Sequence, residues 1–237
     1  MTYDITPPIT PKLAVWPGDT PLSREVLNDM ARGDNIALST LRATMHLGAH
    51  ADGPNHYGKD APAIDERGLD YFLGPCQVIR VEVARATRIT PEMLSPKVSR
   101  EMPAGGGNDL ASRAAGPAQG SGAPGERTIH LQPRVLFATG TFPDPENWNR
   151  DFAALSVELV DFLHERGVIT MGIDTPSVDL FESKDLPAHK AILRCNMSIL
   201  EGLVLKDVPE GTYELIALPL PLVGFDASPV RAVLRTV

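Results

Sequence analysis

The chain has 237 residues, 43% of them hydrophobic, and a formal net charge of −8, so it can form one large domain with a substantial core. The negative charge and the lack of a run of Lys and Arg argue against a nucleic-acid partner. There is no apolar run of about 18 residues and no signal-peptide pattern, so we expect a protein without a membrane segment. Cys76 and Cys195 form no metal-type or disulfide motif, which suits the cytoplasm. We expect the protein to act on a small molecule.

The first informative stretch is "LRATMHLGAHADGPNHY", residues 41–57, which holds three of the six histidines of the chain. Apolar residues occupy its odd positions from 41 to 51, whereas His46, His50 and Asp52 occupy even positions. This period of two residues is typical of a β-strand. It predicts that the three polar side chains lie on one face of that strand.

A straight strand would hold His46 and His50 about 13 Å apart, too far for both to bind one metal ion. Gly48, and the Gly53-Pro54 pair after Asp52, permit the chain to bend. Neutral imidazoles and carboxylates are the ligands that suit zinc and related ions, and one carboxylate can bridge two ions. We therefore predict a metal site here with Asp52 as the bridge; the alternative is a half-exposed strand with ordinary surface polar residues.

The remainder of the chain consists of short apolar runs separated by many of its 22 prolines and 20 glycines, which favours a strand-rich fold. We expect strands at 78–83, 135–139, 168–173, 199–205, 214–218 and 230–234. Ser156 and Gly167 are the expected cap and stop of a helix, and Thr90-Pro91 indicates the start of a shorter one. Segment 101–127 is rich in glycine and alanine, so we expect a mobile insertion in a single domain spanning residues 1–237.

A second polar signal is Glu201, which interrupts the apolar run "MSILEGLVL". A carboxylate in a nonpolar setting is costly unless it is paired with a cation or binds a metal. His189, in "DLPAHKAI", is the histidine nearest to it in the sequence. Glu201 is therefore a further candidate ligand, unless its strand lies at a sheet edge where water solvates the carboxylate.

The segment "HLGAHADGPNH", residues 46–56, resembles the HxGTHxDxPxH signature of the cyclase-like metal-dependent amide hydrolases. Within that family, blocks such as "VWPGDTP", "GIDTPSVD" and "YELIALPLPLVGFDASPVRAVL" are similar to the bacterial kynurenine formamidases, also called arylformamidases. Segment 101–127 falls outside the resemblance. Ala49 stands where the wider family often has threonine, but it falls on the predicted apolar face, so we expect no effect on metal binding.

The resemblance implies hydrolysis of N-formyl-L-kynurenine to L-kynurenine and formate in tryptophan breakdown, with two zinc ions per chain or another divalent ion such as Mn²⁺. The metal ligands that it implies are His46, His50 and Asp52 for the first ion, Asp52 and Glu201 as bridges, and His189 for the second ion. It also implies that His56 is the acid/base catalyst and that Trp16 contacts the substrate. The flat apolar ring of a tryptophan suits an aryl ketone.

The fold implied by the resemblance is a mixed, strand-rich α/β domain of the swivelling β/β/α type with a β-barrel-like core, assembled as a homodimer or homotetramer. A serine hydrolase is disfavoured because the sequence has no GxSxG motif. Three alternatives stay open. They are another amide hydrolase of the same family, such as an isatin hydrolase with manganese, a non-catalytic metal-binding module in which His56 is dispensable, and an interaction protein with incidental histidines.

Overall fold

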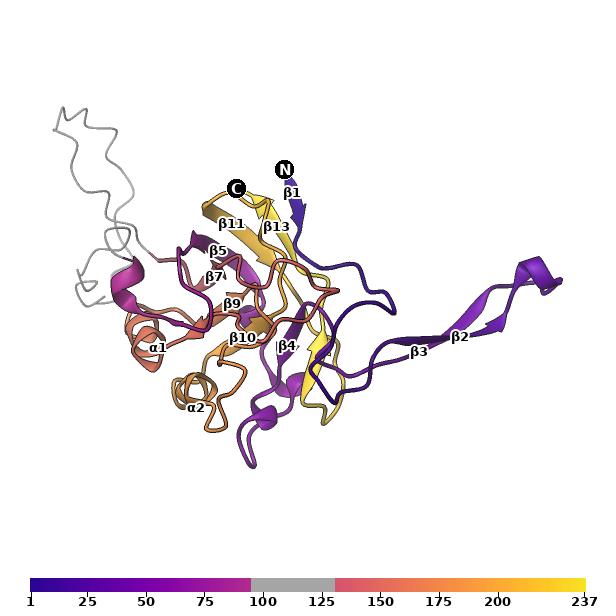
Figure 1. The fold of residues 1–237 in the computed structure, drawn as a ribbon, viewed down its shortest axis with the longest axis horizontal. Helices are drawn as coiled ribbons and strands as arrows, with labels where there is room; N and C mark the ends of the chain where they lie inside the picture. Colours follow the sequence, from indigo (N-terminus) through magenta and orange to yellow (C-terminus); the bar gives the residue numbers. More distant parts are fainter. Residues whose placement is uncertain (95–130) are drawn as a thin grey trace, which may run out of the picture.

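The computed structural model describes residues 1–94 and 131–237 (Figure 1), so the expected insertion at 101–127 lies outside the described residues. The strands are β1 (Thr2–Asp4), β2 (Ser23–Asn28), β3 (Leu38–Arg42), β4 (His50–Asp52), β5 (Leu73–Arg80), β6 (Arg88–Ile89), β7 (Arg134–Ala138), β8 (Ala154–Leu155), β9 (Thr170–Ile173), β10 (Ser198–Glu201), β11 (Gly211–Ile216), β12 (Ala227–Pro229) and β13 (Val233–Thr236). The α-helices are α1 (Val157–His164) and α2 (Pro187–Arg194), and single 3₁₀ turns include Pro54–His56 and Pro91–Leu94. In this part of the chain, no helix has the length and hydropathy needed to cross a membrane.

One large sheet dominates the described part of the chain. Its nine strands follow the order β1-β13-β11-β5-β7-β9-β10-β4-β12. The central strands β5, β7, β9 and β10 pair in parallel, and the strands outside them pair antiparallel. The sheet is strongly curled (Figure 1), which confirms the expected strand-rich α/β fold with a barrel-like core.

Strand β7 shows how the sheet separates two hydrophobic cores. Val135 and Phe137 belong to the core that α1 and α2 cover, whereas Leu136 and Ala138 belong to the core shared with β11 and β13. Successive side chains of a strand point to opposite faces, so this alternation buries both faces of β7. The parallel strands are therefore packed on both faces; β4 pairs with the last of them, β10, and β12 forms the edge of the sheet beyond β4.

The expected strands at 135–139, 168–173 and 199–205 correspond to β7, β9 and β10. Those expected at 78–83 and 214–218 only overlap the ends of β5 and β11, which begin earlier, and the last one overlaps β13, which ends later. β10 ends at Glu201 rather than at residue 205 because Gly202 takes a left-handed conformation, with φ +65°. The expected long helix is confirmed as α1, where the Ser156 hydroxyl accepts a hydrogen bond from Leu159 N at 3.1 Å. The expected short helix is the single 3₁₀ turn Pro91–Leu94.

The prediction of one strand through residues 40–52 is wrong. β3 ends at Arg42, residues 43–49 form a loop, and β4 covers only His50–Asp52. Leu41, expected on the apolar face, is 62% exposed. The chain does turn at Gly48, whose φ is +59°, so the predicted bend is real although the strand around it is interrupted.

Helix α2 was not expected, although it carries His189. Pro187 opens this helix at its first turn, where a missing N–H costs nothing. The preceding residue, Leu186, has φ +45°, a conformation that a sequence pattern does not reveal for leucine.

The strands β2 and β3 form a separate hairpin that projects far from the body of the protein (Figure 1). We call this hairpin, residues 23–42, the arm. Several large apolar side chains of the arm are 40 to 62% exposed, namely Val26, Leu27, Met30, Ile36, Leu38 and Leu41. An isolated two-stranded hairpin is marginally stable at best in water. A projecting hairpin with this many exposed apolar side chains is therefore unusual on a surface that faces only solvent.

Candidate metal centre

Two neighbouring strands bring together residues that are far apart in the sequence. β4 and β10 pair antiparallel, with His50 opposite Glu201. The Nε2 atom of His50 lies 3.4 Å from Asp52 Oδ1 and 3.4 Å from Glu201 Oε2, and these side chains are at most 4% exposed. Glu201 is therefore not a solvated edge residue, because β10 lies between β9 and β4.

The close approach of two glycines sets the orientation of His50. The carbonyl of Gly48 accepts a hydrogen bond from His50 Nδ1 at 2.9 Å, which leaves Nε2 facing the carboxylates. A Cβ atom on Gly202 would lie 2.2 Å from the same carbonyl oxygen, so only glycine fits at that position. The loop before β4 thus packs directly on the turn after β10.

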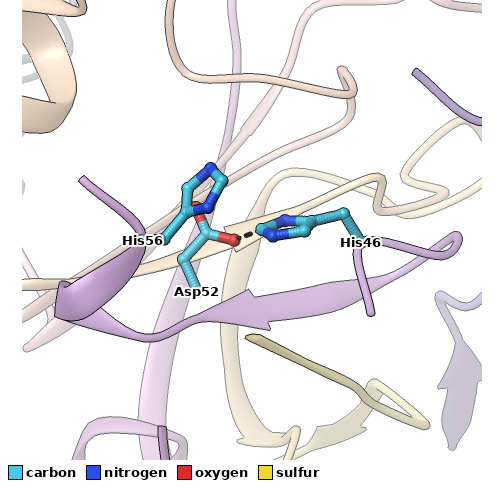
Figure 2. Close-up of side chains that lie close together, drawn as sticks. All are labelled: His46, Asp52 and His56. Atoms are coloured by element: carbon cyan, nitrogen blue, oxygen red, sulfur yellow. Dashed lines mark ion pairs between the residues drawn. The ribbon is translucent and has the colours of Figure 1, made fainter. Parts of the chain in front are cut away.

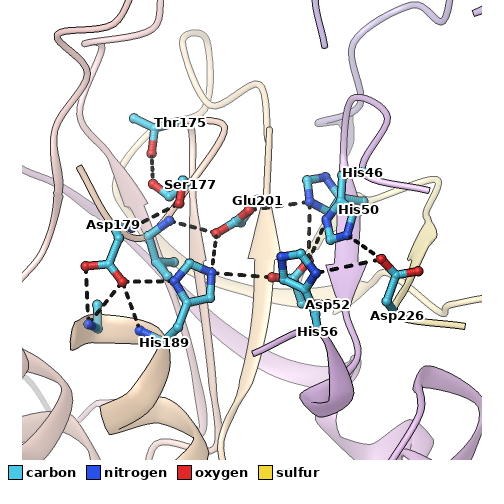
Figure 3. A network of polar contacts seen from close by, with 12 residues as sticks. His46, His50, Asp52, His56, Thr175, Ser177, Asp179, His189, Glu201 and Asp226 are labelled. Carbon is cyan, nitrogen blue, oxygen red and sulfur yellow. Dashed lines mark hydrogen bonds and ion pairs between the residues drawn. The ribbon is translucent and has the colours of Figure 1, made fainter. Parts of the chain in front are cut away.

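The same loop brings His46 to the cluster. Its Nδ1 atom lies 3.1 Å from Asp52 Oδ1, and its ring centroid is 4.9 Å from that of His50 in an edge-to-face arrangement. The turn at Gly48 makes this contact possible, as the spacing argument requires. His46, His50 and Asp52 therefore share one site (Figure 3).

His189 approaches the cluster from α2. Its Nε2 atom lies 3.7 Å from Asp52 Oδ2 and 3.7 Å from Glu201 Oε1. The other ring nitrogen, Nδ1, donates to Asp179 Oδ2 at 2.9 Å, and this carboxylate also accepts from the backbone N–H groups of Ala188 and His189. Asp179 therefore fixes both the start of α2 and the His189 ring, as carboxylates commonly do behind metal-binding histidines.

His56 lies next to His46, in the 3₁₀ turn Pro54–His56. Its ring centroid is 4.2 Å from that of His46. Possible ligand atoms of His46, Asp52 and His56 lie within 4.8 Å of one another (Figure 2), as do those of His50, Asp52 and Glu201. Asp52 belongs to both groups, which is the arrangement expected of a bridge.

The charges of the cluster follow from its burial and its pairing. Burial lowers the pKa of His50 and His189, but the carboxylates of Asp52, Glu201 and Asp179 more than compensate, so that each pKa rises to about 10. Burial opposes the charge of Asp52 as well, yet the surrounding histidines hold its pKa well below the usual value. His56 differs, because burial lowers its pKa and it stays neutral at neutral pH.

Three buried atoms of this cluster have no hydrogen-bond partner, namely His50 Nε2 and both carboxylate oxygens of Asp52. Buried polar atoms are almost always hydrogen-bonded. Three such atoms that converge without a partner therefore indicate a place where a bound group, such as a cation, would satisfy them. Imidazole nitrogens and carboxylate oxygens are atoms that coordinate zinc and manganese in proteins. The residues present thus fit a divalent metal centre.

The cluster opens into a cavity of about 510 Å³. Its lining includes His46, His50, His56, His189 and Glu201, together with the aromatic residues Trp16, Phe142 and Trp148. Trp16 stacks on Phe181 at 5.0 Å and meets Trp148 edge-on at 5.4 Å. All of the predicted site residues therefore lie in or beside one cavity, whose lining combines histidines and carboxylates with aromatic rings.

Sequence reasoning missed two carboxylates beside the cluster, Asp179 and Asp226. Asp226 Oδ2 lies 3.1 Å from His46 Nε2. Both aspartates stand in blocks that resemble the family, "GIDTPSVD" and "VGFDASP", but nothing in their spacing indicates a histidine partner. Tyr57, also missed, packs its ring 5.1 Å from that of His189, and its buried hydroxyl has no partner.

Comparisons with known proteins agree with this chemistry. A family model described as putative cyclase matches residues 3–110. A kynurenine formamidase of Bordetella petrii is 40% identical over 233 residues, which cover 98% of this chain and 97% of that protein.

Solved structures share the fold. A predicted metal-dependent hydrolase from Bacillus stearothermophilus has a TM-score of 0.73 at 24% identity, covering 99% of this chain and 97% of the other. Isatin hydrolase A from Labrenzia aggregata, bound to benzyl benzoate, has a TM-score of 0.74 at 21% identity, covering 99% and 93%. At these identities the likeness concerns the fold alone.

Proposed function

Because the chain belongs to the kynurenine formamidase family, whose members include the 40% identical Bordetella petrii protein, we propose that it hydrolyses N-formyl-L-kynurenine to L-kynurenine and formate. The observation that carries this proposal is the identity over nearly the whole length of both chains. The cavity is compatible with it, since aromatic side chains line it together with a cluster of histidines and carboxylates. The reaction class is hydrolysis of a linear amide.

We further propose that two zinc ions occupy the centre, with Mn²⁺ as the other candidate metal. His46, His50 and Asp52 would hold the first ion, Asp52 and Glu201 would bridge, and His189 would complete the second. The unpartnered atoms of His50 and Asp52 support this proposal. When bound, divalent ions of this kind lower the pKa of water toward about 7 and polarise a carbonyl group.

His56 is the proposed acid/base catalyst. Because burial keeps its pKa below the ordinary value of 6.5, the ring is neutral at pH 7 and can accept a proton from the attacking water. It then returns this proton to the aniline nitrogen as the C–N bond breaks. Trp16 would meanwhile hold the aryl ketone against its indole face, since offset aromatic contacts of this type add to simple burial.

A steady-state assay tests the proposal directly. Purified protein is supplied with N-formyl-L-kynurenine, and the absorbance of kynurenine is followed with and without a chelator. We expect turnover that the chelator abolishes and that added zinc restores. Isatin is the matched second substrate: turnover of isatin with none of N-formyl-L-kynurenine would assign the chain to the alternative amide hydrolase, and no turnover with bound metal would favour a non-catalytic module.

We also propose that the protein is a homodimer. The arm exposes apolar residues on a hairpin that is weak in isolation. A second exposed apolar surface lies before β12, where Leu218, Leu220, Val223 and Phe225 are 40 to 82% exposed. In an isologous dimer the same two surfaces of each subunit can meet those of its partner, which would bury both.

The cytoplasm is the proposed location. Cys76 and Cys195 are both free thiols in the structure. Unpaired cysteines are typical of a reducing compartment.

A further inference from the structure

Asp226 lies beside the metal-ligand cluster but belongs to neither group of candidate ligands. It directly precedes β12, in which Ala227 pairs with Asp52 of β4. Its carbonyl accepts a hydrogen bond from Gly53 N at 2.7 Å, so its backbone is tied to the turn that leads to His56. Figure 3 shows its carboxylate at the opposite end of the cluster from Asp179.

One carboxylate oxygen of Asp226 faces two histidine rings. Its Oδ2 atom lies 3.1 Å from His46 Nε2 and 3.7 Å from His56 Nδ1. A carboxylate accepts hydrogen bonds and donates none, so it favours a proton on each of these two nitrogens. The other nitrogen of His56, Nε2, is then left without a proton, whereas His46 Nδ1 faces a second carboxylate, that of Asp52, at 3.1 Å.

We propose that Asp226 is a positioning residue that fixes the tautomer and ring orientation of His56 and, through the same oxygen, the ring orientation of His46. In this arrangement His56 offers an unprotonated Nε2 for proton transfer. The side chain of Asp226 is 50% exposed, so water weakens each contact. We therefore expect the residue to affect how His56 works more than whether metal is retained.

Kinetics of three variants test this role, which rests on the proposed function for its substrate. Asp226→Asn should keep the fold and the metal but lower kcat about tenfold or more, with KM changed less than about twofold. Asp226→Glu should recover part of the loss, because it restores a carboxylate. Asp65→Asn is the matched control: Asp65 binds Gly224 N of the same loop at 2.9 Å without contacting a histidine, and this variant should match the wild type.

The proposal is overturned if kcat per bound metal ion in Asp226→Asn stays within about twofold of the wild type. It is also overturned if Asp65→Asn loses as much activity, since the effect would then belong to the loop.

A second measurement does not depend on activity. The ¹⁵N NMR spectrum of the histidine rings in metal-free protein at pH 8 reports each tautomer, and the His56→Gln variant identifies the His56 signals. We expect a proton on His56 Nδ1 in the wild type and a shift to the Nε2–H form in Asp226→Ala. An unchanged His56 tautomer would overturn the proposal. Failure of the wild type to hydrolyse N-formyl-L-kynurenine would instead refute the proposed function and leave this spectrum to decide the role of Asp226.

Discussion

At the scale of single residues, the proposed chemistry of the centre depends on which histidines would hold metal and which would move protons. His50 and His189 are buried and oriented by hydrogen bonds from Nδ1, to Gly48 O and to Asp179. His56 has no such hydrogen bond, and its side chain is 36% exposed toward the cavity. These surroundings favour metal binding by the first two and proton transfer by the third.

Substitution of His56 separates catalysis from metal binding. We expect His56→Ala to retain its metal and fold while losing at least about a hundredfold in turnover, because general acid/base groups typically contribute that much or more. His46→Ala should lose both metal and activity. Elemental analysis beside steady-state kinetics distinguishes the two variants. Wild-type turnover in metal-loaded His56→Ala would show that another group moves the proton.

Asp179 supports His189 without facing the cavity. Asp179→Asn should weaken metal binding by about 10 to 100-fold, because the His189 ring loses the charged partner that fixes its tautomer. Competition with a chromogenic chelator measures this affinity. Asp185→Asn removes the same charge from an exposed position nearby and should bind metal as the wild type does. Equal affinities in both variants would contradict the role given to Asp179.

The raised pKa of His189 predicts how the stability of metal-free protein depends on pH. The pKa is about 10 in the folded chain against an ordinary value of 6.5, so the folded state binds the proton more tightly. The resulting stabilisation is complete below about pH 6.5 and is lost as the pH rises toward 10. Calorimetric Tm values of metal-free protein should fall across this window, and His189→Gln should flatten the fall. A Tm that rises from pH 6.5 to 10 would refute the charged pair.

At the scale of structural elements, the contact between the loop before β4 and the turn after β10 holds the proposed ligands His50 and Glu201 in register. Gly202 is the critical position, because a side chain there would overlap Gly48 O and the residue has a positive φ. Two proposed ligands adjoin this contact, His50 through its hydrogen bond to Gly48 O and Glu201 as the residue before Gly202.

We expect Gly202→Ala to destabilise the protein by more than the roughly 1–3 kcal/mol that left-handed strain alone costs, and to lose metal. Gly167→Ala is the control, since Gly167 has φ +78° with open space around it and therefore feels only the strain. Chemical denaturation of both variants gives the difference. If Gly202→Ala were as stable as Gly167→Ala, the close approach of residue 202 to Gly48 O would not contribute to stability, which would contradict this prediction.

Much of this site could be predicted from the sequence, and the reasons are physical. Residue type and spacing identify His46, His50 and Asp52, and an isolated carboxylate in an apolar run identifies Glu201. The continuous strand was mistaken because alternation in residues 43–49 reflects a loop folded back at Gly48 and not an extended segment. Asp179 and Asp226 could not be found in this way, because their partners are decided by tertiary placement.

At the scale of the whole molecule, the arm is notable because contacts within one chain leave its apolar side chains exposed. If it joins two subunits, a charge on its apolar residues should separate them. Leu41→Glu should convert a dimer into a monomer in light scattering after size exclusion, because a buried unpaired carboxylate is costly. Leu69→Glu, at a leucine 56% exposed on the body of the protein, should remain dimeric. A monomeric wild type, or a dimeric Leu41→Glu, would refute the role of the arm.

The pairing of β4 with β10 has a consequence for biogenesis. The proposed metal ligands come from residues 46–52 and 189–201, and pairings between such distant segments form slowly because loop closure costs entropy before the contacts compensate. During synthesis the N-terminal segment leaves the ribosome first, so its histidines wait in solution without Glu201. We therefore expect metal loading to follow completion of the chain. Metal ions that bind only when β4 and β10 are paired would stabilise the folded state by mass action. We expect release of these ions to limit the rate at which the metal-loaded protein unfolds.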